Sequence, residues 1–229
     1  RGQSADARRY FEQSIEVSER HGLMERLMVA RTNLVEVYHL CGNLSKGLQL
    51  ADKSLHHARE VRHPYGIGLA LRYRVMMLTD IGRCVEAEEN AREALRIQRQ
   101  LDNQEEAFAS LVVLIRTILA RGDFARSEPF LAEAVELMED YDTEGFAPVV
   151  HAWRGRVAAE AGRLDEARAC VVAAGQVEGR KWPFQQARYS LNVARVLACL
   201  GERDRAVAAV DEALEVCDAS GYRFYAMRA

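Results

Sequence analysis

A pattern of small residues repeats along this sequence with a period of 40 residues. Glycines recur at this spacing, with one interval of 39, at Gly2, Gly42, Gly82, Gly122, Gly162 and Gly201. The fifth residue after each glycine is small: Ala7, Gly47, Ala87, Ser127, Ala167 and Ala206. So is the twelfth: Ser14, Ser54, Ala94, Ala134, Ala174 and Ala213. Three columns in register over six units are too regular for chance, and a period of about 20–50 residues indicates a repeat architecture.

Each period predicts a helix, a tight turn and a second helix. The glycine is expected to end the first helix in the left-handed backbone conformation, which costs other residues about 1–2 kcal/mol. Before Gly122, the residues Leu111, Leu114, Ile115 and Ile118 have the i, i+3, i+4, i+7 spacing of one helix face. The small residues after each glycine would let neighbouring helices approach closely.

The Gly-x4-Ala-x6-Ala ladder on paired helices resembles the tetratricopeptide repeat (TPR) superfamily. The usual TPR period is about 34 residues. The longer unit of this chain resembles the MalT-like TPR arrays of bacterial signalling and regulatory proteins. The resemblance covers nearly the whole chain. It implies an all-α fold, a right-handed α-α superhelix (TPR-like solenoid) of about eleven antiparallel helices with a concave inner face.

The repeat register predicts one solenoid over residues 1–229 and also its units. The expected units are 1–21 (a second helix only), 22–61, 62–101, 102–141, 142–181, 182–220, and 221–229 as the start of another. Incomplete units at both ends indicate a fragment of a larger protein. Pro129 predicts a late start of its helix with Ser127 as the cap. Gly175 and Gly179 predict either early termination of a helix or a hinge.

Bulk composition narrows the functional class. The net charge of −3 disfavours nucleic-acid binding, which usually needs a basic face. No apolar run approaches the roughly 18 residues of a membrane span, so no membrane association is predicted. The five cysteines (Cys41, Cys84, Cys170, Cys199 and Cys217) have no C-x-x-C spacing and indicate free thiols in a reducing cytoplasm.

Catalytic and cofactor motifs are missing from the sequence. There is no glycine-rich phosphate loop, no H-E-x-x-H and no G-x-S-x-G. His56, His57 and His63 cluster near one connection between helices, but adjacent helical side chains diverge by about 100°. Solvated histidines are therefore favoured over a metal site. The sequence predicts a protein that is not an enzyme and has no cofactor and no metal.

One column of the first helices suggests a binding surface. Six residues before the repeat glycines stand Glu36, Met76, Arg116, Arg156 and Arg195. In TPR proteins this column faces the concave groove, so the resemblance implies that these residues line it, with Arg72 and Arg188 on neighbouring columns. Guanidinium groups suit carboxylates, which favours a protein or peptide partner with acidic segments. Alternatively, the arginines pair with acidic residues of adjacent helices or are solvated.

A second column supplies aromatic and amide side chains. Nine residues before the glycines stand Asn33, Tyr73, Trp153 and Asn192. An exposed aromatic residue in a groove would anchor a partner, whereas a buried one would fill the core between helices. The full candidate set is Arg116, Arg156, Arg195, Arg72, Arg188, Tyr73, Trp153, Asn33, Asn192 and Glu36.

These features together predict a non-catalytic scaffold or regulatory domain that holds a protein or peptide in its groove, within a larger bacterial signalling protein. Two alternatives remain open at the level of sequence. One is a small-ligand (inducer) sensor of a MalT-like transcriptional regulator, with a polar pocket near Arg116 and Arg156. The other is a self-association module that uses the cut C-terminal end, where Tyr222, Phe224 and Tyr225 stand.

Overall fold

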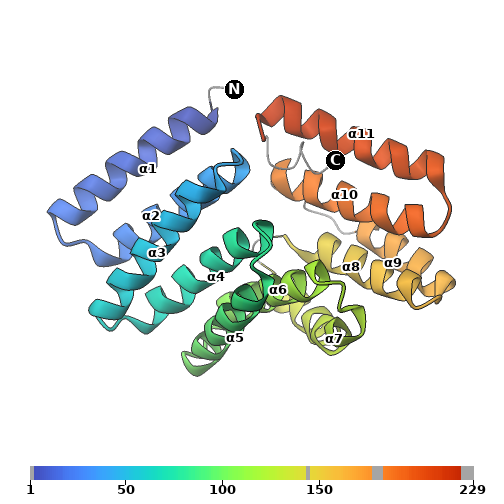
Figure 1. Ribbon diagram of the computed structural model, residues 1–229, viewed down its shortest axis with the longest axis horizontal. Helices are drawn as coiled ribbons and strands as arrows, with labels where there is room; N and C mark the ends of the chain where they lie inside the picture. The colour runs from blue at the N-terminus through green and yellow to red at the C-terminus, as the bar shows by residue number, and fades with distance from the viewer. Residues whose placement is uncertain (1–2, 143–144, 177–182, 223–229) are drawn as a thin grey trace. The chain divides into compact units, whose positions relative to one another are not determined.

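The computed structural model describes residues 3–142, 145–176 and 183–222. In these ranges the chain forms eleven α-helices and no strand (Figure 1), which confirms the predicted all-α, TPR-like solenoid. The helices are α1 (Gln3–Arg20), α2 (Met24–Leu40), α3 (Leu44–Glu60), α4 (Pro64–Asp80), α5 (Cys84–Gln100), α6 (Gln104–Ala120), α7 (Phe124–Tyr141), α8 (Ala147–Glu160), α9 (Leu164–Gln176), α10 (Pro183–Cys199) and α11 (Arg203–Ser220). None of the described helices is long and apolar enough to cross a membrane.

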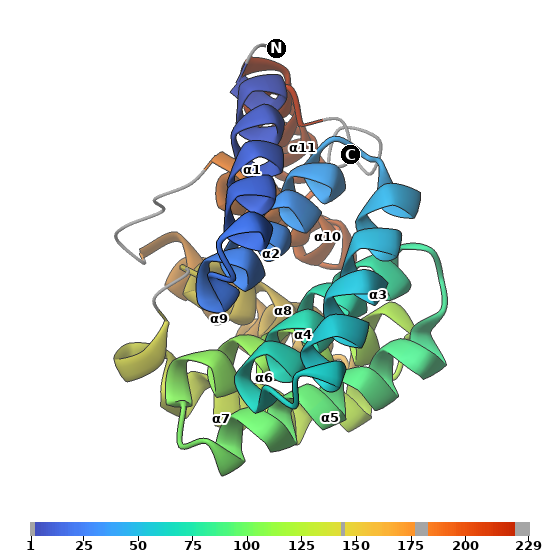
Figure 2. The same ribbon diagram turned by 90° about the vertical axis from the view of Figure 1, so that its left-hand side faces the viewer.

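The helices form two compact units, residues 1–121 with α1 to α6 and residues 122–229 with α7 to α11. In the first unit, α2 packs on α1 and α3, α4 packs on α3 and α5, and α5 packs on α6 (Figure 2). The first helices of successive repeats also meet, as α2 with α4 and α4 with α6. In the second unit, α8 contacts α7, α9 and α10, and α10 packs along α11. Contacts between sequence neighbours dominate in each unit, as in other helical solenoids.

The repeat glycines end their helices as predicted. Gly42, Gly82, Gly122, Gly162 and Gly201 have φ values of 75°, 82°, 77°, 76° and 75°. At Gly82, the N–H of the glycine donates to Thr79 O at 3.2 Å, and the N–H of Arg83 donates to Leu78 O at 2.9 Å. This pair of bonds satisfies carbonyls that the end of a helix otherwise leaves without partners. Gly2 lies outside the described residues.

The small columns mark close contacts between helices. Ala87, Ala94, Ala134, Ala167, Ala174 and Ala213 are almost completely inaccessible to solvent. At Gly47 a Cβ atom would lie 2.7 Å from Met77 Sδ and 3.5 Å from Tyr38 Cβ. The α3 backbone at this position therefore lies against side chains of α2 and α4, and a larger residue would displace the Met77 side chain.

The apolar core of the first unit follows α4 and α6. Both helices bury residues on most of their circumference: α4 packs against α2, α3, α5 and α6, and α6 packs against α4 and α5. The most deeply buried side chains here are Leu71, Val75, Met77, Leu78, Leu111, Leu114, Ile115 and Ile118. Polar residues on these two helices therefore need partners inside the protein.

The predicted late start of the helix at Pro129 is wrong. Helix α7 begins at Phe124 and contains Pro129 in its interior. Ser127 does not cap the helix; its hydroxyl donates to Phe124 O at 2.6 Å and is buried. The helix continues through Pro129 without the backbone bond that proline cannot make, and Leu131, two residues later, is buried. Gly175 lies inside α9, whose described part ends at Gln176, and Gly179 lies outside the described residues.

Candidate functional site

A buried carboxylate links three first helices of the first unit. Asp80, the last residue of α4, accepts from Arg116 Nη2 of α6 on Oδ1 at 2.5 Å. Its Oδ2 lies 2.7 Å from Nε2 of His39 on α2. The side chains of Asp80 and His39 are 0% and 1% exposed, and that of Arg116 is 16% exposed. Arg116, the first arginine of the candidate column, therefore makes an ion pair inside its own unit.

The electrostatics of this cluster favour the ionised carboxylate. Burial alone would raise the pKa of Asp80, but the charge of Arg116 and the hydrogen bond from His39 outweigh it and hold the pKa well below its usual range. Asp80 therefore carries a full negative charge at neutral pH. An ionised buried group of this kind is tolerated only because its partners are aligned with it.

A hydroxyl pair lies beside this cluster. Thr117 Oγ1 on α6 donates to Val113 O at 2.8 Å, so its only proton is committed to the backbone. Thr79 Oγ1 on α4 lies 2.8 Å from Thr117 Oγ1 and must therefore be the donor in that contact. Both hydroxyls are buried. The ends of α4 and α6 are thus connected by an ion pair and an adjacent hydrogen bond.

Arg72 and Tyr73 lie inside the first unit. The Arg72 residue is 3% exposed, and its Nε lies 3.2 Å from Oε2 of Glu106 in the first turn of α6. Its guanidinium carbon is 4.7 Å from the centroid of the Tyr73 ring, a cation–π distance. Tyr73 is 8% exposed. Tyr73 therefore fills the core between helices, and Arg72 pairs with an acidic residue of an adjacent helix. Both outcomes are among the alternatives that the sequence left open.

The α2 members of the columns are more accessible. Asn33 and Glu36 are half-buried, and Val29, one turn before Asn33, is exposed. The residue that occupies the column in α4, Met76, is buried. In the first unit, α2 therefore presents more of these positions to solvent than α4 does.

In the second unit the candidate residues of α8 and α10 meet. Trp153 Nε1 donates to Asn192 Oδ1 at 3.0 Å, and Asn192 Nδ2 donates to Arg188 O at 2.7 Å. Arg195 Nη1 lies 3.5 Å from the same Asn192 oxygen. Trp153 and Asn192 are buried, and Arg195 is half-buried. Asn192 thus positions both an aromatic residue and an arginine.

Two arginines of the second unit lie over aromatic rings. The guanidinium carbon of Arg156 is 4.9 Å from the centroid of Phe124, and that of Arg188 is 5.5 Å from Phe146. Arg156 is half-buried and Arg188 is buried. Stacking on a ring restricts a guanidinium while leaving its edge available for hydrogen bonds.

The histidines near the second repeat have separate roles. His63 is the N-cap of α4, where its Nδ1 accepts from the Gly66 N–H at 3.0 Å. His56 is exposed, and its Nε2 lies 3.2 Å from Glu60 Oε1. Over the described ranges, no three His, Cys, Asp or Glu side chains converge as metal ligands would. All five cysteines are free thiols, as predicted.

Sequence reasoning missed His39 and Asp80. Both stand close to a repeat glycine, but in different columns, three and two residues before it. A search for recurring residue types therefore passes over them. The available signal was different: a single titratable residue close to an apolar run near the end of a first helix, as Asp80 after Met76-Met77-Leu78-Thr79. In a solenoid, such residues of neighbouring first helices are brought together by stacking.

Paired helices, glycine turns and buried small columns define a TPR-type helical repeat protein. The chain belongs to the family described as the MalT-like TPR region, which matches residues 1–150. The tetratricopeptide repeat family also matches residues 148–172. These matches confirm the resemblance seen in the sequence. No curated protein sequence matches the chain.

Solved structures share the fold at low sequence identity. BtubC (BKLC) from P. vanneervenii is 21% identical with a TM-score of 0.66, and the match covers 96% of this chain and 91% of that one. The apo form of RapI is 11% identical with a TM-score of 0.76, over 93% and 77% of the two chains. A Rap protein in complex with Competence and Sporulation Factor is 14% identical with a TM-score of 0.65, over 98% and 68%.

Proposed function

We propose that this chain is a non-catalytic module of a cytoplasmic bacterial signalling protein, which binds a protein or peptide partner on its first helices. The observation that carries this proposal is the set of arginines held at partly exposed positions by neighbouring side chains. Asp80 fixes Arg116, Asn192 contacts Arg195, and Phe124 underlies Arg156. Such preorganisation reduces the entropy that a side chain loses when it binds.

The partner's chemistry follows from these side chains. Arg116, Arg156 and Arg195 favour carboxylates, while Asn33 and Glu36 of α2 add polar groups at half-buried positions. The remaining candidates are buried, Arg72 and Tyr73 in the first unit and Arg188, Trp153 and Asn192 in the second. A partner with acidic segments is therefore proposed. The Rap complex is a case in which the same fold was solved with a bound factor, and it supports a protein or peptide partner in general.

The test is a binding screen against a peptide array, with the double variant Arg156→Gln/Arg195→Gln. Both residues are half-buried, so neutral substitutions should leave the fold intact, which circular dichroism checks. Arg116 is left in place, because its replacement would leave the buried Asp80 without its main counter-charge. The matched control is Arg203→Gln, an exposed arginine of α11.

Selective binding of acidic peptides by the wild type and the control, weakened about tenfold or more in the double variant, would support the proposal, because one charged hydrogen bond contributes about that factor. Equal binding by all three proteins would exclude Arg156 and Arg195 as part of the binding surface.

A further inference from the structure

An arginine in the first unit is held by groups from two flanking helices. Arg74 of α4 donates from Nε to Asp52 Oδ1 of α3 at 2.6 Å. It also donates from Nη2 to Glu86 Oε1 at 2.7 Å and from Nη1 to Asn90 Oδ1 at 3.2 Å, both on α5. Only 14% of its side chain is exposed. We call these four residues the Arg74 clamp; it uses the second helices of two successive repeats.

The four positions of the Arg74 clamp have equivalents two repeat periods later, in the second unit, where two of the three partner residues are replaced by other types. Arg154 of α8 replaces Arg74, and Glu166 of α9 replaces Glu86. Ala132 of α7 stands where Asp52 stands, and Cys170 of α9 stands where Asn90 stands. The second unit therefore keeps the arginine but lacks the carboxylate and the amide that hold it in the first unit.

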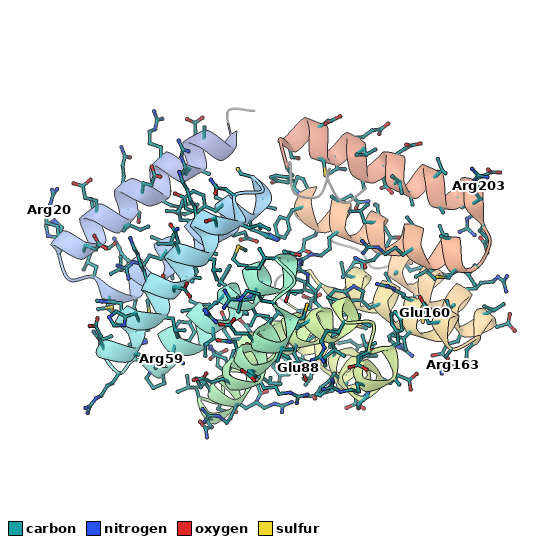
Figure 3. The ribbon with its side chains drawn as sticks, viewed as in Figure 1. Arg20, Arg59, Glu88, Glu160, Arg163 and Arg203 are labelled. Carbon is teal, nitrogen blue, oxygen red and sulfur yellow. The ribbon has the colours of Figure 1, made fainter. Side chains whose placement is uncertain are left out.

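Glu166, the acidic residue that the second unit keeps, forms a hydrogen bond with Arg163. Arg163, in the turn between α8 and α9 (Figure 3), donates from Nε to Glu166 Oε2 at 2.8 Å. It also donates from Nη2 to Glu128 Oε1 of α7 at 2.7 Å. No hydrogen bond or ion pair joins Arg154 to an acidic group among the residues that the structure describes. The half-buried Arg154 thus has the position of a clamped arginine without its clamp.

A pocket lies beside Arg154, at the position where Ala132 replaces the carboxylate of Asp52. It lies between α7, α8 and α9, has a volume of about 420 Å³, and is lined by both Arg154 and Ala132. Its apolar wall consists of Leu131, Val135 and Val157, of which Leu131 and Val157 are buried. The volume is within the range of small-ligand sites, which combine apolar walls with a few placed polar groups.

We propose that this pocket binds a carboxylate carried on an apolar group, and that the ligand carboxylate pairs with Arg154 as Asp52 pairs with Arg74. The Arg74 clamp shows that an arginine at this place in the repeat can receive a carboxylate from the α3 side. In the second unit, Ala132 leaves that side open. The apolar wall then takes the aliphatic part of the ligand, and the charge-assisted hydrogen bond orients it.

The surrounding charges restrict the ligand further. Arg163 forms ion pairs with both Glu128 and Glu166 and offsets one of their two charges, so these carboxylates are engaged away from Arg154. Glu136 also lines the pocket and is exposed. A ligand with several negative charges would be repelled by it. The site therefore favours a single carboxylate over a phosphate or a polyanion, whether a small carboxylic acid or an Asp or Glu side chain next to Leu or Val.

The test follows the Nε–H resonance of Arg154 by NMR while one of two probes is added at millimolar concentration. One probe is 4-methylpentanoate and the other is the blocked peptide acetyl-Leu-Asp-Leu-amide. The proposal expects a saturable shift with at least one probe and none with inorganic phosphate. Tighter binding of the small acid identifies a free carboxylate as the ligand, and tighter binding of the peptide identifies a side chain of a partner.

Three variants complete the test. In Ala132→Asp the new carboxylate should occupy the place of the ligand, abolish the shift, and raise the melting temperature by about 2–4 °C over its neutral control Ala132→Asn. Arg154→Gln, followed through ligand-detected NMR, should weaken binding about tenfold or more, and Arg203→Gln should bind as the wild type does. Binding by Ala132→Asp equal to that of Ala132→Asn, or no saturable binding by the wild type, would overturn the proposal. The arginine column is not involved, so the outcome is independent of the proposed function.

Discussion

Asp80 connects three helices of the first unit through one side chain. Its carboxylate is completely buried and touches one residue of α2 and one of α6. A buried charge that loses its partner is far more costly than an exposed one. The reverse also holds: Arg116 and His39 are oriented by Asp80, so one substitution at residue 80 disturbs three helices at once.

We expect Asp80→Asn to lower the free energy of unfolding by about 3 kcal/mol, the lower end for a broken buried pair, because Arg116 is partly exposed and can turn toward water. Urea denaturation at neutral pH measures this. The comparison is Asp52→Asn, whose side chain is 50% exposed and whose loss should cost about 1 kcal/mol or less. A similar cost for both variants would contradict the special role of Asp80.

The same carboxylate predicts a dependence on pH. Its folded-state pKa lies below that of the unfolded chain, about 3.9 for a free aspartate. The contribution of Asp80 is therefore fully present above the unfolded pKa and is lost as pH falls through the folded one. The difference in unfolding free energy between wild type and Asp80→Asn should shrink as pH falls below about 3.9. Urea titrations at several pH values below about 5 test this; a difference that does not shrink there would refute it.

At the level of single elements, the turns differ in whether the residue with a left-handed backbone conformation is a glycine. Glycine occupies the left-handed position in each turn between the two helices of a repeat. In two of the turns that lead to the next repeat, the same conformation falls on Arg62 and Asp102, with φ values of 52° and 55°. These positions carry strain that the glycine turns do not.

Arg62→Gly should therefore raise the free energy of unfolding by about 1 kcal/mol, because glycine adopts this conformation without a steric penalty. Arg62 is exposed, so little else is lost with its side chain. Arg62→Ala, which keeps the Cβ atom, serves as the control and should change little. Thermal unfolding of both variants decides the matter, and equal melting temperatures would show that the left-handed residue carries no strain.

Helix α7 offers a second test at this scale. Pro129 lies in its interior and removes one backbone hydrogen bond. We expect Pro129→Ala to stabilise the protein by about 1–3 kcal/mol, the value of the restored bond and the relieved ring contact, less the greater freedom of the unfolded chain. Denaturant unfolding provides the measurement. A loss of stability would mean that the proline shapes α7 in a way that its neighbours require.

At the scale of the whole chain, the sequence predicted what repeats and missed what does not. The turn glycines and the small columns recur from unit to unit, so their physical roles could be inferred from the spacing alone. The partner of Arg116 could not, because His39 and Asp80 occur once each and in different columns. The clamp at Arg74 and its absence at Arg154 could not be predicted either. The repeat register aligns Asp52 with Ala132, but only the packing of α3 and α7 shows that this position faces the arginine.

A solenoid held by neighbour contacts should also respond locally to mutation, because its stability is close to a sum of repeat and interface terms. Asp80→Asn should lower amide protection against hydrogen exchange in α2, α4 and α6, and leave α10 and α11 nearly unchanged. Asn192→Ala should do the opposite, since Asn192 joins α8 to α10 through Trp153. Exchange measured by mass spectrometry on both variants separates the two regions, as local openings are resolved in this way. A uniform loss of protection along the chain would instead show that the repeats unfold as one cooperative unit.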